Sequence, residues 1–145
     1  MKLYLNNCCF NRPFDDQEQV RIRLEAEAKL EIQSRIKKGQ LILAWSFMLD
    51  FENSQNVDAL KEKEIARWAD VAQDFFTGST KTLELSLEIM GCGIKKKDAV
   101  HLACAIESEC DYFLTTDDGI LKRKDAIKQI VIINPVDFII LTESS

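Results

Sequence analysis

The sequence contains a single histidine, His101, and its five cysteines include no Cys-x-x-Cys pair. A structural zinc site needs four closely spaced Cys or His ligands, so we do not expect zinc. An odd number of cysteines, with Cys8 next to Cys9, suits reduced thiols better than a disulfide framework. We expect Cys8 and Cys9 to pack as small apolar side chains, with a redox role for the pair as the alternative.

The sequence also lacks long apolar runs and glycine-rich loops. No apolar run approaches membrane-spanning length, and the N-terminus has no basic start followed by an apolar stretch, so neither a membrane segment nor a signal peptide is expected. No glycine-rich phosphate-binding motif follows the first predicted strand, which argues against a nucleotide cofactor. The composition, 46% hydrophobic and 30% charged over 145 residues, predicts one cytoplasmic domain spanning residues 1–145.

Apolar periodicity predicts alternating strands and helices. The predicted strands cover residues 2–6, 41–45, 111–114 and 129–133. The predicted helices cover residues 17–38, 47–52, 58–76, 82–90 and 97–109, and a last helix begins near residue 134 with Pro135 in its first turn. This order predicts an α/β fold in which a parallel sheet of at least four strands has helices on both faces, a three-layer α/β/α arrangement.

The spacing also predicts which helix faces are buried. The helix over residues 17–38 is expected to begin at a cap provided by Asp15 or Asp16 and to end at Gly39. Its predicted buried stripe consists of Val20, Leu24, Ala28, Ile32 and Ile36. The inward residues predicted for the helix over residues 82–90 are Leu83, Leu87 and Met90.

Carboxylates follow or precede several predicted elements. Asp98 begins the central helix, whereas Asp117 and Asp118 follow the strand at residues 111–114. Such junctions of an open α/β sheet can converge on one crevice, and converging carboxylates favour a hard metal ion. Each acid also has a simpler explanation, because Asp98 could cap its helix and Asp117 could cap a turn.

Glu52 lies one or two helical turns beyond the second strand and could point back at the same crevice, as could Asp50. The alternative for Glu52 is an ordinary exposed glutamate. His101 lies one turn after Asp98, and we expect a packed, hydrogen-bonded histidine rather than a ligand or base.

The net charge of −5 argues weakly against nucleic-acid binding. Basic residues nevertheless flank the central acids, and the candidate substrate contacts are Lys95, Lys97 and Arg12. The alternative is that these lysines form a solvated helix face.

Four segments together resemble the PIN-domain family, and in particular its small VapC-like toxins. They are KLYLNNCCFNRPFDDQ, WSFMLDFEN, KKKDAVHLACAIESECDYFLTTDDGIL and INPVDFI, which appear in order from residue 2 to about residue 138. The resemblance implies a quartet of acids that binds Mg²⁺ or Mn²⁺ and cleaves single-stranded RNA. It places these positions at Asn6, Glu52, Asp98 and Asp117.

The sequence departs from this family at Asn6, where members carry an aspartate. Asparagine keeps a carbonyl oxygen but removes one negative charge from the site. The resemblance therefore implies a ribonuclease that is weakened or inactive, and the alternative is an impaired PIN domain that binds RNA or an antitoxin protein. It also implies a homodimer.

Overall fold

The computed structural model describes residues 1–143, so the last two residues of the expected domain lie outside the described part. Five parallel strands form one sheet in the order β3-β2-β1-β4-β5. The strands are β1 (Lys2–Leu5), β2 (Ile42–Ser46), β3 (Asp74–Phe76), β4 (Tyr112–Leu114) and β5 (Val131–Ile133). The α-helices are α1 (Asn7–Asn11), α2 (Val20–Lys37), α3 (Phe47–Ser54), α4 (Ala59–Val71), α5 (Thr80–Met90), α6 (Lys96–Glu107), α7 (Asp118–Leu121) and α8 (Pro135–Glu143). Two short 3₁₀ turns are η1 (Arg12–Phe14) and η2 (Lys124–Ala126).

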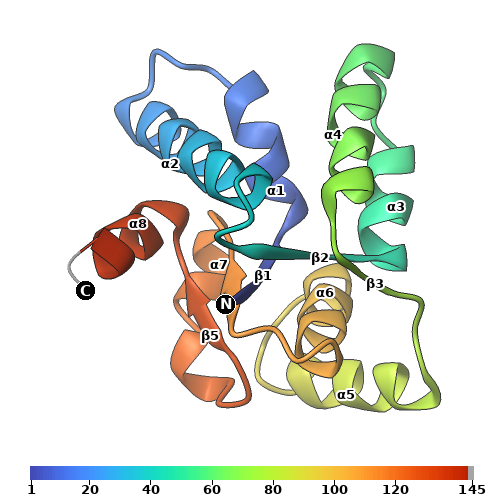
Figure 1. The fold of residues 1–145 in the computed structure, drawn as a ribbon. Coiled ribbons are helices and arrows are strands. Elements are labelled where there is room, and N and C mark those ends of the chain that lie inside the picture. The colour runs from blue at the N-terminus through green and yellow to red at the C-terminus, as the bar shows by residue number, and fades with distance from the viewer. Residues whose placement is uncertain (144–145) are drawn as a thin grey trace.

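Helices cover both faces of the sheet, as the sequence predicts. The connection from β1 to β2 through α2 and the connection from β3 to β4 through α5 and α6 run in opposite directions across the sheet. Because such crossovers are right-handed, they place these helices on opposite faces. Figure 1 shows α2 beside α8 on one side of the sheet and α5 beside α6 on the other.

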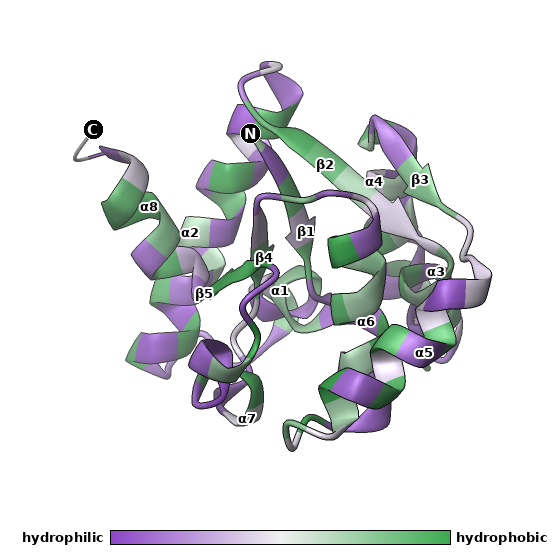
Figure 2. Ribbon diagram, turned by 90° about the horizontal axis from the view of Figure 1, so that it is seen from below, coloured by the Kyte–Doolittle hydropathy of each residue, from purple (hydrophilic) through white to green (hydrophobic). Residues whose placement is uncertain are grey.

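The central strand β1 is buried on both faces. Leu3, Tyr4 and Leu5 are all fully buried, which fits the continuous apolar run expected of a strand inside a parallel sheet. Figure 2 shows hydrophobic residues along β2 and β5 as well. None of the described helices combines the length and the apolar character needed to cross a lipid bilayer.

The helix predicted for residues 58–76 is too long. It ends at Val71, and Ala72 adopts an extended conformation. The backbone N–H of Gln73 then donates to the carbonyl of Leu43 at 3.1 Å and starts the edge strand β3 beside β2. Sheet pairing therefore overrides the helical spacing of the apolar residues.

The predicted stripe on α2 is correct only toward the end of the helix. Val20 and Leu24 are exposed, and the buried positions of that half include Glu25 and Lys29. The predicted cap is also wrong, because Gln19 precedes the helix without a side-chain cap. The end of the helix agrees with the prediction: its last turn carries Arg35 and Lys37, and Gly39 adopts a positive φ of 76°.

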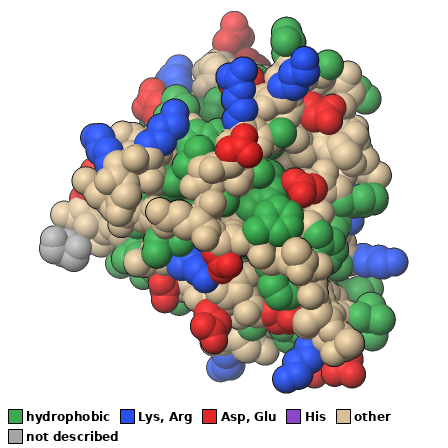
Figure 3. All heavy atoms as spheres, turned by 45° about the vertical axis from the view of Figure 1, so that its right-hand side comes forward, with side chains coloured by type: hydrophobic (Ala, Val, Ile, Leu, Met, Phe, Trp, Pro, Cys, Tyr) green, Lys and Arg blue, Asp and Glu red, His purple; other side chains and the backbone are tan. Residues whose placement is uncertain are grey.

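The face predicted for α5 is wrong in the same way. Leu83, Leu87 and Met90 are exposed, whereas the buried residues are Thr82, Ser86 and Ile89. Ser86 Oγ donates to the carbonyl of Thr82 at 2.7 Å, so its hydroxyl is satisfied inside the protein. On the side of the molecule that carries α3, α4 and α5, hydrophobic side chains gather at the surface (Figure 3).

Candidate functional site

The candidate site lies where β1 and β4 end side by side. From β1 the chain crosses to β2 on one side, whereas β4 leads to β5 on the other, so the sheet reverses its winding between β1 and β4. Ligands of open α/β sheets bind in the crevice at such a switch point. Asn6 follows β1 and Asp117 lies three residues after β4, so both lie at the edge of the sheet where a switch-point site would form.

Asn6 is buried and fully engaged. Its side-chain oxygen accepts from the backbone N–H of Asn7 at 2.9 Å and caps α1, which explains why the chain turns into a helix here. Its side-chain nitrogen donates to Thr115 Oγ1 at 3.0 Å. Thr115 Oγ1 also accepts from the backbone N–H of Asp117 at 3.2 Å. The Thr115 hydroxyl therefore links Asn6 to the turn that carries Asp117.

Glu52 points back at the sheet from α3, as predicted. Ser46 caps this helix by accepting from the backbone N–H of Leu49 at 3.3 Å. Glu52 is half-buried, and its Oε1 lies 2.9 Å from Nε2 of His101. The competing acid Asp50 instead accepts from the indole nitrogen of Trp45 at 2.8 Å, so it stabilises the end of β2.

The carboxyl of Glu52 is kept ionised by its surroundings. Burial alone would raise its pKa, but the pKa is lowered overall by the His101 ring, by the side-chain amide of Asn7 and by Lys97. Asn7 follows directly after Asn6, so two neighbouring asparagines act on different parts of the site.

His101 is fully buried, as expected of a packed histidine, and it joins Glu52 to the core. Its Nδ1 lies 2.6 Å from the hydroxyl of Tyr4, which lies 2.6 Å from Ser46 Oγ. The Glu52 carboxylate can only accept, so Nε2 of the ring carries the hydrogen. On the other side of the ring, Nδ1 contacts the Tyr4 hydroxyl, whose pKa is raised well above its usual value by burial.

Asp98 lies in the first turn of α6 and is half-buried. The helix begins after Lys95 without a side-chain cap, so Asp98 does not cap it. Burial raises the pKa of Asp98, and so do the negative charges of Asp117 and Glu52, while His101 and Lys95 act in the opposite direction. The negative charges of Asp117 and Glu52 therefore both act on Asp98.

Asp117 combines a structural role with a position at the end of β4, at the switch point of the sheet. Its Oδ1 accepts from the backbone N–H of Gly119 at 2.7 Å and caps α7, which is the structural role that the sequence analysis gave as the alternative for Asp117. Its neighbour Asp118 is turned away and forms a two-fold contact with Arg21, at 2.8 and 2.9 Å. Arg21 also donates to the carbonyl of Thr116 at 3.0 Å, so α2 holds the turn that carries Asp117.

The side chains at the candidate site determine how an Mg²⁺ or Mn²⁺ ion could be held there. Within residues 1–143, no three His, Cys, Asp or Glu side chains lie close enough together to hold an ion directly. Mg²⁺ usually keeps several waters and binds through one or two carboxylates, and a nearby cation would offset the negative charges that Asp117 and Glu52 bring to Asp98. The residues therefore fit a hydrated ion better than one enclosed by protein ligands.

The basic residues proposed as substrate contacts differ in how freely they can act. Lys95 and Lys97 are exposed beside Asp98, and Lys97 Nζ donates to the side-chain oxygen of Gln55 at 3.3 Å. Arg12 is held at 2.9 Å by Asp15 and also at 2.9 Å by the buried Glu25. A role for Arg12 in substrate binding stays a prediction, and its established contacts stabilise the fold.

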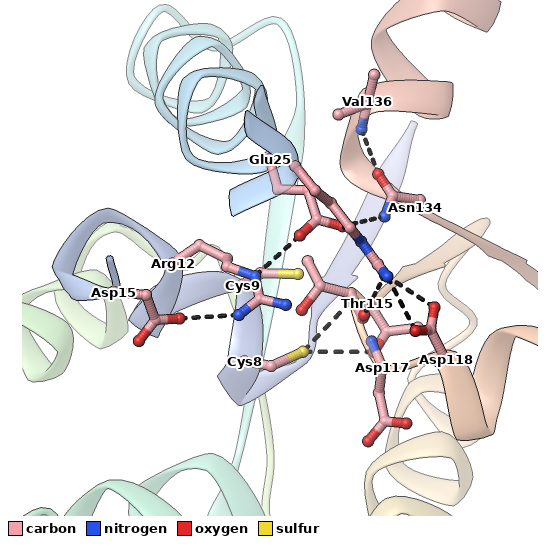
Figure 4. A network of polar contacts seen from close by, with 12 residues as sticks. Cys8, Cys9, Arg12, Asp15, Glu25, Thr115, Asp117, Asp118, Asn134 and Val136 are labelled. Atoms are coloured by element: carbon pink, nitrogen blue, oxygen red, sulfur yellow. Dashed lines mark hydrogen bonds and ion pairs between the residues drawn. The ribbon is translucent and has the colours of Figure 1, made fainter. Parts of the chain in front are cut away.

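Glu25 is the centre of a polar network beside the site (Figure 4). Its two carboxylate oxygens accept from Arg12 and Arg21, and from the side-chain nitrogen of Asn134 at 2.5 Å. Asn134 in turn accepts from the backbone N–H of Val136 and orders the start of α8. The network thus connects η1, α2, the Asp117 turn and α8.

Cys8 and Cys9 are free thiols, and they occupy different environments. Cys9 is buried, as expected of a packed cysteine. Cys8 Sγ lies 3.4 Å from Thr115 Oγ1 and 3.4 Å from the backbone nitrogen of Thr116. The adjacent Cys9 side chain, with the hydrogen bonds from Thr115 and Thr116, lowers the pKa of Cys8 to about 6 against the effect of burial. Neither observation tests the redox alternative.

Several residues of the site were missed by sequence reasoning. Asn7 and Thr115 contact the predicted positions Glu52 and Asn6 directly, whereas Tyr4 acts through His101. Thr115 could have been found, because a polar residue directly after a buried strand lies at the same sheet edge as Asn6. Tyr4 gave no such signal, since an aromatic residue in a buried strand is ordinary core.

Two solved structures share this fold over nearly their whole length. FitAcB from Neisseria gonorrhoeae aligns with a TM-score of 0.57 and 12% identity, covering 92% of this chain and 97% of that chain. VapBC2 from Rickettsia felis, bound to a DNA fragment from its promoter, aligns with a TM-score of 0.56 and 15% identity, covering 92% and 98%. No protein-family model and no curated protein matches the sequence. These alignments show a PIN-like three-layer α/β fold.

Proposed function

We propose that this chain is a metal-dependent endoribonuclease of the VapC-like PIN type whose activity is weakened or lost through Asn6. The observation that supports the proposal is the placement of Glu52 on α3, Asp98 in the first turn of α6 and Asp117 after β4 beside the switch point of a PIN-like sheet, where Asp117 and Glu52 raise the pKa of Asp98. Acids from three separate elements have no structural need to approach one another, because like charges destabilise the fold. Function is the simplest reason for bringing them together.

Mg²⁺ or Mn²⁺ would be held by Asp98 and Asp117, with Glu52 acting directly or through a water. Such an ion offsets charge on a phosphodiester and lowers the pKa of an attacking water. In this arrangement, His101 keeps Glu52 ionised and fixed in direction, since it donates from Nε2 at 2.9 Å. Lys95 and Lys97 would contact phosphate groups of single-stranded RNA, which adds affinity without base specificity.

Asn6 accounts for the proposed loss of activity. Its side-chain oxygen already accepts from Asn7, and its nitrogen donates to Thr115. An aspartate in its place could still accept from Asn7 but would bring a fourth negative charge to the crevice. Asparagine therefore relieves the repulsion among the acids while weakening any site for a cation.

The second candidate function is binding without catalysis. It is favoured by the complete hydrogen bonding of Asn6, because every polar atom of its side chain has a partner inside the protein. In this case the chain would bind RNA or an antitoxin protein. The neighbour VapBC2 joins a VapC-type protein to a second component, which supports an antitoxin partner for this chain, and a homodimer is proposed on the family resemblance.

The test is manganese-dependent cleavage of a mixed-sequence single-stranded RNA. It compares the native protein with Asn6→Asp, with Asn6→Asp carrying Asp98→Ala, and with Asn6→Asp carrying Asp70→Ala. Asp70 is exposed on α4 and serves as the matched control for loss of one aspartate. We expect cleavage by Asn6→Asp and by its Asp70→Ala version only.

Other outcomes have defined meanings. If the native protein already cleaves and the variant that combines Asn6→Asp with Asp98→Ala does not, Asp98 is required, three acids suffice and the chain is an active enzyme. If none of the four proteins cleaves RNA, the nuclease proposal is wrong. RNA binding measured on the same samples, with purified native protein, then tests the binding function.

A further inference from the structure

A cavity of about 450 Å³ lies between η1, α2 and α4, away from the candidate site. Its walls contain none of Asn6, Glu52, Asp98 or Asp117. Aromatic side chains line it from three elements, namely Phe10 of α1, Phe14 of η1 and Trp68 of α4. Its size falls within the range of small-molecule pockets.

A buried cation without a carboxylate partner reaches this cavity. Lys29 on α2 is 4% exposed, and its ammonium lies 5.2 Å from the centre of the Phe10 ring and 5.3 Å from that of Trp68. In the part of the chain that the structure describes, no acid lies within ion-pair distance of it. A buried lysine is usually paired, because burial strongly disfavours the charged form.

Two further nitrogen donors line the same cavity. Gln33, one turn after Lys29, is 7% exposed, and its amide nitrogen has no hydrogen-bond partner within residues 1–143. Lys37, two turns after Lys29, lies 5.2 Å from the centre of the Trp68 ring. The lining acid Glu64 is already paired with Arg67 at 3.0 Å. Two amine side chains and one amide donor therefore face the cavity with no carboxylate of the described residues paired to them.

We propose that this cavity binds a phosphate monoester through Lys29, Lys37 and Gln33. A phosphate monoester carries nearly two negative charges at neutral pH and several acceptor oxygens, which match two ammonium groups and an amide. A carboxylate offers one charge and leaves one ammonium uncompensated. The aromatic walls favour a monoester with a ring-bearing group over inorganic phosphate alone.

The ionisation of Lys29 agrees with this geometry. Burial lowers the pKa of Lys29 to about 7; the nearby Cys9 raises it and Lys37 lowers it. A bound dianion would supply the missing opposite charge and stabilise the protonated form.

The test measures the melting temperature and the heat of binding of the full chain at constant ionic strength, with inorganic phosphate, phenyl phosphate and benzoate. We expect both phosphates to bind, phenyl phosphate more tightly, and benzoate to bind at least about tenfold more weakly. Lys29→Met should weaken phenyl phosphate binding about tenfold or more while leaving the unliganded protein no less stable, because it removes an uncompensated buried charge. Lys63→Met removes an exposed lysine from α4 and should leave the affinity unchanged.

Each contrary result overturns the proposal. These results are no binding of either phosphate, equal losses for Lys29→Met and Lys63→Met, or benzoate binding as tightly as phenyl phosphate. If Lys29→Met fails to fold, Gln33→Leu takes its place, with weaker phenyl phosphate binding expected and unchanged binding contradictory. All these measurements are independent of any ribonuclease activity.

Discussion

Replacing Glu25 by glutamine tests the polar network that supports the candidate site (Figure 4). Glu25 is 1% exposed, and its two oxygens accept from three donors, in Arg12, Arg21 and Asn134. Glutamine has nearly the same volume but only one accepting oxygen. Whichever way its amide turns, its nitrogen meets at least one donor and the network loses its negative charge.

The magnitude follows from the exposure of the partners. Breaking a fully buried ion pair by removing one charge costs about 3–5 kcal/mol. The side chains of Arg12 and Arg21 are 21% and 50% exposed, so water compensates part of the loss. A lost hydrogen bond to a charged group costs about 1.5–3 kcal/mol. We expect Glu25→Gln to lower the free energy of unfolding by about 2–3 kcal/mol.

Urea unfolding followed by circular dichroism measures this change. The midpoint should fall while the dependence on urea concentration stays the same. Glu27→Gln removes the same charge from an exposed position of α2 and should change the stability by less than about 0.5 kcal/mol. Equal losses of stability for the two substitutions would refute the reasoning, because the loss would then come from removing a negative charge from α2 and not from the specific contacts of Glu25.

Three other predictions concern single side chains. Tyr4→Phe removes the hydroxyl that joins two buried partners and should cost about 1–3 kcal/mol in urea unfolding, whereas Tyr112→Phe should cost less; equal costs would contradict the account. Because its pKa is lowered to about 6, Cys8 should react with iodoacetamide near neutral pH before the other cysteines, as peptide mass spectrometry can test; earlier labelling of Cys9 would be contradictory. Burial lowers the pKa of Lys29 from 10.5 to about 7, so between these pH values the unfolded chain binds more protons and this residue makes stability rise with pH. Lys29→Met should flatten that rise in pH-dependent unfolding, and an unchanged pH profile would show that the native lysine is not perturbed.

The sheet was largely predictable because its central strands are buried on both faces. Strands such as β1 are continuous apolar runs between polar turns, which the sequence displays directly. The edge strand β3 was not predictable, since Phe75 and Phe76 continue the apolar spacing of α4. Only the pairing of β3 with β2 ends the helix, and that pairing joins residues far apart in the sequence.

The prediction of which face of α2 is buried was wrong for a related reason. Glu25 and Lys29 carry charges, so hydrophobic spacing assigns them to the surface. Arg21 lies one turn before Glu25 on the same helix, but the other partners of these two residues come from η1, the β5–α8 connection, α1 and α4. No local pattern reveals these distant contacts. A buried charge is the residue type that a pattern of apolar positions cannot place.

The candidate site was predictable in part. Positions at strand ends were predictable, because the carboxyl ends of parallel strands share one edge of the sheet. The choice between Glu52 and Asp50 needed the structure, which pairs Asp50 with Trp45 and Glu52 with His101. The separation of Asp118 from Asp117 also needed it, since Arg21 belongs to a distant helix.

Manganese binding measured by titration calorimetry tests the central claim that Asn6, Asp98, Asp117 and Glu52 form one metal site. The account predicts that Asn6→Asp binds Mn²⁺ about tenfold or more tightly than the native protein, and that adding Asp98→Asn removes this gain. Adding Asp70→Asn instead should leave the gain intact. If Asn6→Asp binds no more tightly than the native protein, or keeps its gain without Asp98, the four positions do not form one metal site.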